Sequence, residues 1–330
     1  MPRMLRAQQV VTIRVNVAET HGAFKPVWAY FGHDEPNYTY NPEGRDLLSE
    51  LASLSPYPVH DRAHNLLTTG NGTPALKWGS TNAFTLDASG RPVNNWIILD
   101  KIFDTYRELD IRPYVEIGFM PEALSTHPEP YQHHYPNGPL FTGWSYPPKN
   151  YPQWAELIYR WVRHSVERYG RKEVERWDWE VWNEPNIGYW HGTLAEYCKL
   201  YDYTADAVKR ALPSARVGGP ATTGPASPRA AAFFQDFLKH CVSGKNDATG
   251  KTGAPIDFIS FHAKGRTRIV DGHVQMDIGQ NLRDIDRGFA IIASFPQLRR
   301  LPVVISESDP EGCAACAAMT HPQNGYRNTS

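Results

Sequence analysis

The sequence lacks several features that would fix the class of protein at once. Its 330 residues contain no run of 18 apolar residues, which is the length that a transmembrane helix needs. The net charge of −1 and the pI of about 6.9 disfavour nucleic acid or an anionic membrane as the main partner. No Gly-x-Gly-x-x-Gly follows any expected strand, so a dinucleotide-binding fold is disfavoured as well.

Cysteine is also scarce, with only Cys198, Cys241, Cys313 and Cys316. Four cysteines are too few for a disulfide scaffold, which slightly favours a cytoplasmic, reduced protein. The apolar run near the N-terminus is short and interrupted by Arg14, so it is not a convincing signal peptide. Cys313 and Cys316 have C-x-x-C spacing, but structural zinc needs a second pair at suitable spacing. We expect simple thiols or a local disulfide there, and no metal or other cofactor.

Aromatic residues, in contrast, are plentiful, with 10 Trp and 17 Tyr. Their flat, rigid side chains suit stacking against sugar rings as well as a packed core. The densest stretch is Trp177–Trp190, WDWEVWNEPNIGYW. Apolar and polar residues alternate at its start with the period of a strand. Pro185 cannot donate to a sheet ladder, so we expect Glu184 to be the last residue of that strand.

Strand-like and helix-like segments alternate along the chain. This alternation predicts an α/β fold with a parallel sheet. Acidic and histidine residues follow the strands, which favours a (β/α)₈ TIM barrel over an open sheet. The expected strands are 27–31, 58–67, 112–119, 177–184, 215–219, 256–262 and 302–307, and the expected helices are 43–54, 96–109, 154–169, 193–212, 230–241 and 282–293.

An eighth strand–helix unit is missing from this pattern, because the polar residues 313–330 contain no run typical of a buried strand. We therefore expect a barrel over residues 23–330 that is incomplete at its C-terminal end. Residues 1–22 form a separate N-terminal segment with a strand at Val10–Val17. A long connection at 125–150, rich in Pro, His and Tyr, exceeds the usual length of structureless loops and is therefore expected to be functional.

Two glutamates follow strands that lie on opposite sides of such a barrel. Glu184 after the fourth strand and Glu307 after the seventh would project into the same basin at the C-terminal ends of the strands. Glycoside hydrolysis needs two such carboxyl groups, one as proton donor and one as nucleophile or base, ~5–5.5 Å apart in retaining enzymes. Tryptophans and Pro185 crowd Glu184, and an apolar setting favours a protonated carboxyl group. We expect Glu184 to be the acid and Glu307, between two serines, to remain ionised and attack.

Polar residues at the same strand ends are candidates for holding a sugar. Asn183 can donate an amide N–H to a sugar hydroxyl, and His64 and His262, after the second and sixth strands, add further donors. A single histidine in such a place is more often structural. Because each of these histidines shares one rim with two glutamates, a role in substrate binding is about as plausible as a structural one.

With these residues in place, the chain resembles glycoside hydrolase family 39. The pair WNEPN and ISESDP is the specific part of the resemblance, since NEP alone indicates only the larger clan of barrels. The matching stretches cover nearly the whole chain and are Phe31–Tyr40 (FGHDEPNYTY), Arg62–Leu67 (RAHNLL), Gly118–Leu124 (GFMPEAL), Trp179–Asn186 (WEVWNEPN), Phe258–Gly265 (FISFHAKG) and Val304–Pro310 (VISESDP).

The resemblance implies a retaining glycosidase that cleaves β-xylosidic bonds, like a xylan 1,4-β-xylosidase, through a covalent glycosyl-enzyme. It implies Glu184 as acid/base and Glu307 as nucleophile. Substrate contacts are expected from His64, Asn65, Asn183, His262 and Lys264. It also implies that full-length members add an eighth strand and a β-sandwich, neither of which this sequence shows. The expected partner is a glycoside or oligosaccharide.

Lys264 keeps a second substrate class open. A β-xyloside has no carboxylate, so a rim lysine two residues after His262 has no evident task with it. The iduronidase branch of the family has a similar His-x-Lys-Gly stretch, in which a lysine suits a uronic acid carboxylate and Arg62 could assist. Alternatively, Lys264 forms an ion pair with a local carboxylate such as Asp271. A uronic-acid-specific glycosidase and an inactive or merely carbohydrate-binding barrel both remain open.

Overall fold

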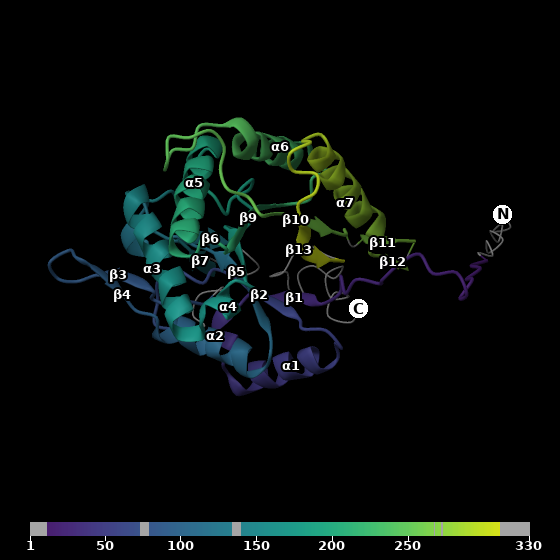
Figure 1. Cartoon of the computed structure of the whole chain (residues 1–330), viewed down its shortest axis with the longest axis horizontal. Coiled ribbons are helices and arrows are strands. Elements are labelled where there is room, and N and C mark those ends of the chain that lie inside the picture. Colours follow the sequence, from purple (N-terminus) through teal and green to yellow (C-terminus); the bar gives the residue numbers. More distant parts are fainter. Residues whose placement is uncertain (1–11, 73–78, 134–139, 267, 272, 311–330) are drawn as a thin grey trace.

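The computed structural model describes all residues except 1–11, 73–78, 134–139, 267, 272 and 311–330. Seven parallel strands form one sheet in the order β1-β2-β5-β8-β9-β10-β13. Figure 1 shows them around a common centre with the helices outside. The expected α/β barrel of the TIM type is confirmed. The strands are β1 (Tyr30–His33), β2 (His60–Ala63), β5 (Arg112–Ile117), β8 (Asp178–Val181), β9 (Arg216–Thr222), β10 (Phe258–Lys264) and β13 (Val303–Asp309).

The helices lie between consecutive barrel strands, close to where the apolar spacing predicts them. Thr193 and Glu196 form a capping box at the start of α5, which satisfies two backbone N–H groups that the helix leaves unpaired. None of the helices in the described ranges combines the length and the apolar character that crossing a bilayer requires. They are α1 (Pro42–Ser53), α2 (Ile97–Glu108), α3 (Tyr151–Tyr169), α4 (Arg171–Val174), α5 (Leu194–Ala211), α6 (Pro228–Ser243) and α7 (Ile278–Ala293), with short 3₁₀ helices η1 (Pro36–Tyr38) and η2 (Glu122–Leu124).

Three hairpins that the sequence pattern did not predict follow β2, β5 and β10. One of them, β6–β7, lies in the connection 125–150, which was expected to be a long functional loop and for which no strands were predicted. Each strand in these hairpins has only three or four residues, too few to show a clear two-residue period. The hairpins are β3 (Phe84–Leu86) with β4 (Pro92–Asn94), β6 (Tyr131–His133) with β7 (Leu140–Gly143), and β11 (Arg268–Val270) with β12 (His273–Gln275).

The barrel is nearly closed, with a seam between β1 and β13. Within the described ranges no strand pairs with the outer edge of either. A cavity of about 770 Å³ lies along this seam, lined by residues of both strands, and reaches the barrel interior at Arg62 and His64. The described chain thus supplies the seven strands that the sequence predicts. Cys313 and Cys316 lie outside the described residues.

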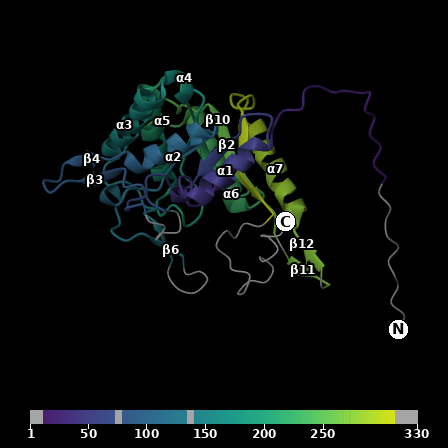
Figure 2. The same ribbon diagram turned by 90° about the horizontal axis from the view of Figure 1, so that it is seen from below.

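The N-terminal strand expected at Val10–Val17 is not formed over the part that the structure describes. Residues 12–17 have no strand assignment, and Ile13, Val15 and Val17 are exposed. Figure 2 shows this purple segment running away from the barrel. The alternating pattern is compatible with a strand, but a strand needs a partner to pair with, and no strand that the structure describes pairs with residues 12–17.

Tryptophans from the stretch Trp177–Trp190 and from α3 fill the space between the barrel and its helices. Trp179 on β8 meets Trp161 on α3 edge to face, with ring centroids 5.3 Å apart. Trp177 stacks on Phe103 of α2 at 5.1 Å. All four rings are at most 2% exposed. These aromatic residues therefore belong to the core, and the alternate residues of β8, such as Glu180, face the inside of the barrel.

We predict that Trp161→Ala lowers the free energy of unfolding by about 3–5 kcal/mol, because it removes a large buried ring and leaves a cavity. Urea denaturation measures this loss. Trp28→Ala is the matched control, since Trp28 is 45% exposed, and surface substitutions of this kind change stability by less than about 1 kcal/mol. Equal losses in the two variants would contradict the packing described here.

Candidate active site

Glu184 lies in the turn after β8. The strand ends at Val181, so the expectation that Glu184 is the last strand residue is wrong. Trp182 and Glu184 have φ angles of +73° and +44°, and this left-handed geometry turns the chain out of the ladder. The backbone N–H of Glu184 donates to the carbonyl of Ala221 at 2.9 Å, which anchors the turn on β9. Left-handed non-glycine residues cost free energy and are often found at functional sites.

Glu307 lies within β13, which pairs with β10. The register between these strands shifts after Phe261, so that His262 is paired with Glu307. A bulge of this kind re-aims side chains locally. Here it brings a histidine and a glutamate from adjacent strands to the same end of the barrel.

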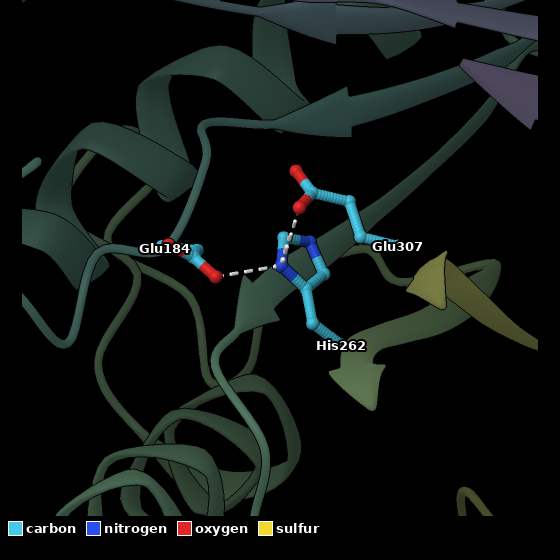
Figure 3. Close-up of side chains that lie close together, drawn as sticks. All are labelled: Glu184, His262 and Glu307. Atoms are coloured by element: carbon cyan, nitrogen blue, oxygen red, sulfur yellow. Dashed lines mark hydrogen bonds and ion pairs between the residues drawn. The ribbon is translucent and has the colours of Figure 1, made fainter. Parts of the chain in front are cut away.

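Glu184 and Glu307 approach the same imidazole from two sides, as Figure 3 shows. Nδ1 of His262 lies 2.9 Å from Oε1 of Glu184 and 3.5 Å from Oε2 of Glu307. One oxygen of each carboxylate and this ring nitrogen all lie within 4.8 Å of one another. The structure therefore brings together the two glutamates that the sequence pattern singled out, although they are far apart in the chain.

Positively charged side chains surround Glu307. Nη1 of Arg62 donates to Oε1 at 3.0 Å and Nε2 of His64 lies 3.1 Å from the same oxygen. Nζ of Lys264 lies 2.5 Å from Oε2. Burial alone raises the pKa of this carboxyl group, but its interactions with His262, Lys264 and His64 hold the pKa of Glu307 well below its usual value. Glu307 is therefore an ionised carboxylate at neutral pH.

Arg62 also binds two fully buried carboxylates. Its Nε donates to Glu180 at 2.6 Å, and its Nη2 lies 2.9 Å from Glu116. The spacing pattern of the sequence did not indicate Glu116 and Glu180 as part of the site. The available signal was an acidic residue between apolar ones in a strand, VEI in β5 and WEV in β8, because such a residue must have a partner when it is buried.

Asn183 and Asn65 both lie in this region. The side-chain oxygen of Asn183 accepts from Nη2 of Arg62 at 3.1 Å, so its amide NH₂ is the part that can donate to a sugar. Asn65 is fully buried with a φ angle of +55°. Its backbone N–H donates to Oε1 of Glu116, and neither atom of its side-chain amide has a hydrogen-bond partner among the described residues.

Lys264 forms an ion pair with carboxylates, as one of the two expectations held, but Asp271 is not among them. Its Nζ contacts Glu307 and lies 3.3 Å from Asp309. Burial by itself lowers the pKa of Lys264, and the surrounding carboxylates, first Glu307 and then Glu184, outweigh that effect and raise it above the usual value. Lys264 is therefore cationic throughout the physiological range.

One group of side chains in the described ranges has the arrangement of a metal site, namely Glu184, His262 and Glu307. The charges of Arg62 and Lys264, both in contact with Glu307, oppose the binding of a further cation at that carboxylate. The same three residues are suited to acid–base and nucleophilic catalysis at a single bond, which needs no metal ion.

A parallel barrel with two carboxylates meeting over one basin at the C-terminal strand ends is the arrangement that barrel glycosidases use. The sequence model of the glycosyl hydrolases family 39 matches residues 12–326. The chain belongs to that family.

Relatives in the family carry two different names. A beta-xylosidase of Geobacillus stearothermophilus is 37% identical over 196 residues, which are 59% of this chain and 35% of that protein. Human alpha-L-iduronidase is 30% identical over 162 residues, 48% of this chain and 23% of that protein. The crystal structure of a monomeric beta-xylosidase from Caulobacter crescentus CB15 superimposes with a TM-score of 0.67 at 27% identity, covering 86% of this chain and 52% of that one. The chain spans about a third or less of the length of these curated relatives.

We predict that Arg62→Met lowers the free energy of unfolding by about 3–5 kcal/mol at pH 7, because it leaves buried carboxylates without their cation. The loss shrinks as the pH falls toward about 4, since the folded variant then binds protons that relieve the repulsion. Urea denaturation at several pH values measures both effects.

The control for this substitution is Arg45→Met. Arg45 also binds a carboxylate, Glu108, at 2.7 Å, but both side chains are exposed, and solvent-exposed ion pairs contribute little. A loss in Arg62→Met that is no larger than in Arg45→Met, or that grows with acidity, would contradict the role of Arg62 as the buried counter-charge.

Proposed function

We propose that the protein is a retaining glycoside hydrolase with Glu307 as nucleophile and Glu184 as acid/base. The observation that carries this proposal is the separation of the two carboxylates, whose facing oxygens lie within 4.8 Å of each other. Retaining glycosidases keep their carboxyl groups ~5–5.5 Å apart, whereas inverting enzymes need ~6.5–9.5 Å to admit a water molecule between them.

In the first step an oxygen of Glu307 forms a bond to the anomeric carbon while the bond from that carbon to the leaving oxygen breaks. Glu184 gives its proton to the leaving oxygen, so that the aglycone departs as a neutral alcohol. In the second step Glu184 takes a proton from water, the water oxygen bonds to the anomeric carbon, and Glu307 is released as a carboxylate. Oε2 of Glu307 is the attacking atom in this scheme, because it faces Glu184 across His262.

The sugar is held by donors around these two glutamates. The amide of Asn183 is oriented by Arg62 and is assigned to the 2-hydroxyl, an interaction that strengthens in the transition state. Asn65 and His262 each keep a buried polar atom without a partner in the described chain, the amide of Asn65 and Nε2 of His262. Buried polar atoms are ordinarily satisfied, so these are candidates for contacts with bound substrate or water.

The substrate class that we propose is a β-xyloside. Two relatives, from Geobacillus stearothermophilus and Caldicellulosiruptor saccharolyticus, are 37% and 40% identical to this chain over the matched residues and are named beta-xylosidases. Lys264 is already occupied by Glu307 and Asp309, so a neutral sugar leaves all the ion pairs of the site intact. A β-xyloside also carries no carboxylate, and the site then needs no cation beyond those that Glu307 already engages.

A uronoside is the second candidate, and the observation that favours it is the position of Lys264. Its ammonium group lies beside the nucleophile, which is where a carboxylate on the sugar ring would need a cation. To bind such a substrate, Lys264 would exchange Asp309 for the carboxylate of the sugar.

We predict that a 2-fluoro-xyloside with a good leaving group labels Glu307, because it traps the glycosyl-enzyme that retention requires. Tryptic digestion and fragment-ion mass spectrometry locate the label within the peptide that begins at Leu301. That peptide also contains Asp309 and Glu311, so the fragment ions must separate these three residues. Label on another residue would refute the nucleophile assignment. An inverted anomeric configuration in the first-formed product, detected by NMR, would refute retention.

Lys264→Ala separates the two substrate classes. If the protein is a xylosidase, we expect kcat/KM on an aryl xyloside to exceed that on an aryl uronide in the parent, and the variant to keep that preference. If Lys264 binds a uronate carboxylate, the variant loses activity on the uronide by roughly 10- to 100-fold more than on the xyloside, as loss of a charged hydrogen bond predicts. The ratio of the two rate constants in parent and variant is the measurement.

A further inference from the structure

Glu116 is a buried carboxylate to which the proposed reaction assigns no step. It lies on β5 and is fully buried, and its carboxylate contacts Arg62, His64 and Asn65 at the end of β2. Its Oε2 lies 2.9 Å from Nη2 of Arg62 and 3.0 Å from Nδ1 of His64. Its Oε1 accepts from the backbone N–H of Asn65 at 2.9 Å. The side chain of Glu116 therefore holds Arg62, His64 and Asn65 at the edge of the site.

Arg62 and His64 connect Glu116 to the proposed nucleophile in the same way. Each contacts Oε2 of Glu116 through one nitrogen and Oε1 of Glu307 through another, at 3.0 Å for Arg62 and 3.1 Å for His64. The side chains of Arg62 and His64 are only 4% and 8% exposed, so solvent screens these contacts weakly. Two cationic bridges thus join the same pair of carboxylate oxygens.

We propose that Glu116 is a positioning residue for Glu307, which acts by keeping the imidazole of His64 protonated so that His64 and Arg62 together hold Oε1 of the nucleophile. This inference rests on the proposed function for its catalytic consequence, and its electrostatic part stands on the geometry alone. With Oε1 fixed, Oε2 is the oxygen left to face Glu184 and the sugar.

Charged groups face His64 from every strand that packs against it. Glu116 on β5 and Glu307 on β13 are the nearest, Arg62 lies beside it on β2, and Oδ1 of Asp34 after β1 is 3.5 Å from Nε2. Burial by itself lowers the pKa of His64, but the charge of Glu116 and then that of Glu307 outweigh burial and raise the pKa to about 10. The imidazole is then cationic below about pH 10 and neutral above it.

The nature of the contact with Glu116 determines which variant is informative. Nδ1 of His64 lies 3.0 Å from Oε2 of Glu116, and the charge of Glu116 raises the pKa of His64 more than the hydrogen bond between the two side chains does. The charge of Glu116, more than its hydrogen-bonding capacity, is therefore the property to remove. Glu116→Gln keeps the size of the side chain and deletes that charge.

Glu180 supplies a matched control on the neighbouring strand. It is also fully buried and also binds Arg62, through Nε at 2.6 Å. No contact joins it to His64 among the described residues. Glu180→Gln therefore removes one buried negative charge and one ion pair of Arg62, as Glu116→Gln does, and leaves the pairing of His64 with Glu116 unchanged.

The deciding experiment is the titration of His64 by NMR in protein with isotope-labelled histidine, with no substrate present. The signal of His64 is assigned by its loss in His64→Gln among the 13 histidines. We expect the parent to titrate at about pH 10. Glu116→Gln lowers that midpoint by about 1–3 pH units, because it removes an opposite charge next to the imidazole. Glu180→Gln leaves the midpoint where it is in the parent. The midpoint in Glu116→Asp lies nearer to that of the parent than the midpoint in Glu116→Gln does.

A parent midpoint close to the ordinary value for histidine would overturn the proposal, and so would equal shifts in the Glu116 and Glu180 variants. If Glu116→Gln does not fold, the parent midpoint and Glu116→Asp still decide, because the proposal requires a high midpoint in both.

Hydrolysis of an activated aryl xyloside gives the catalytic readout. Such a leaving group needs no proton from Glu184. Deprotonation of Glu184 at high pH therefore does not hide the effect of the titration of His64 on the rate. In Glu116→Gln we expect kcat/KM to fall by roughly tenfold as the pH rises through the lowered midpoint of His64, because a charge-assisted bond to Glu307 becomes a weaker neutral one. Glu180→Gln follows the pH profile of the parent. A parent without hydrolytic activity would refute the proposed function, and the titration would still decide the electrostatic role of Glu116.

Discussion

The interior of this barrel depends on one buried guanidinium. Arg62 lies at the end of β2 and contacts Glu116, Glu180 and Glu307, which come from three other strands. Three carboxylates so close together in a desolvated interior could not all remain ionised without a permanent cation between them. Arginine suits this place because its guanidinium keeps its charge and offers several donors in fixed directions. Lysine would offer a single point charge and could not reach all three partners at once.

The placement of the two glutamates around this cation depends on local departures from regular strand geometry. Left-handed residues at Trp182 and Glu184 carry the chain out of β8 and into the basin. A register shift in β10 pairs His262 with Glu307. A regular barrel would keep each strand in its ladder, and its side chains would alternate strictly between the interior and the helices. β10 has a second register shift, between Ser260 and Phe261 against β9, so its irregular positions lie at the site or directly before it, in keeping with the rule that strain and bulges collect at functional positions.

The sequence was sufficient to predict the large features, because those depend on repeated signals. Seven apolar strands, the six helices between them and the meeting of Glu184 with Glu307 at one end of the barrel all follow from spacing. The hairpins could not be predicted, because strands of three or four residues such as Phe84–Leu86 show no clear period. The exact end of β8 was missed, because it depends on backbone angles that Trp182 adopts only in the folded chain. Glu116 and Glu180 were overlooked, because a single acidic residue in an apolar strand does not reveal which cation it meets.

The charge balance of the site also bears on the choice of substrate. Arg62, His64 and Lys264 bring positive charge to Glu307, and every one of them already has a negatively charged partner within 3.1 Å. A neutral sugar enters such a site without disturbing any ion pair. A sugar with a carboxylate adds a negative charge beside two glutamates, and Lys264 must then give up Asp309 to compensate it. Because Asp309 is 33% exposed, water can solvate it after such an exchange, so the cost is smaller than for a fully buried partner. The proposed neutral glycoside thus requires no exchange of ion pairs, whereas the alternative acidic glycoside requires one, which the exposure of Asp309 makes less costly.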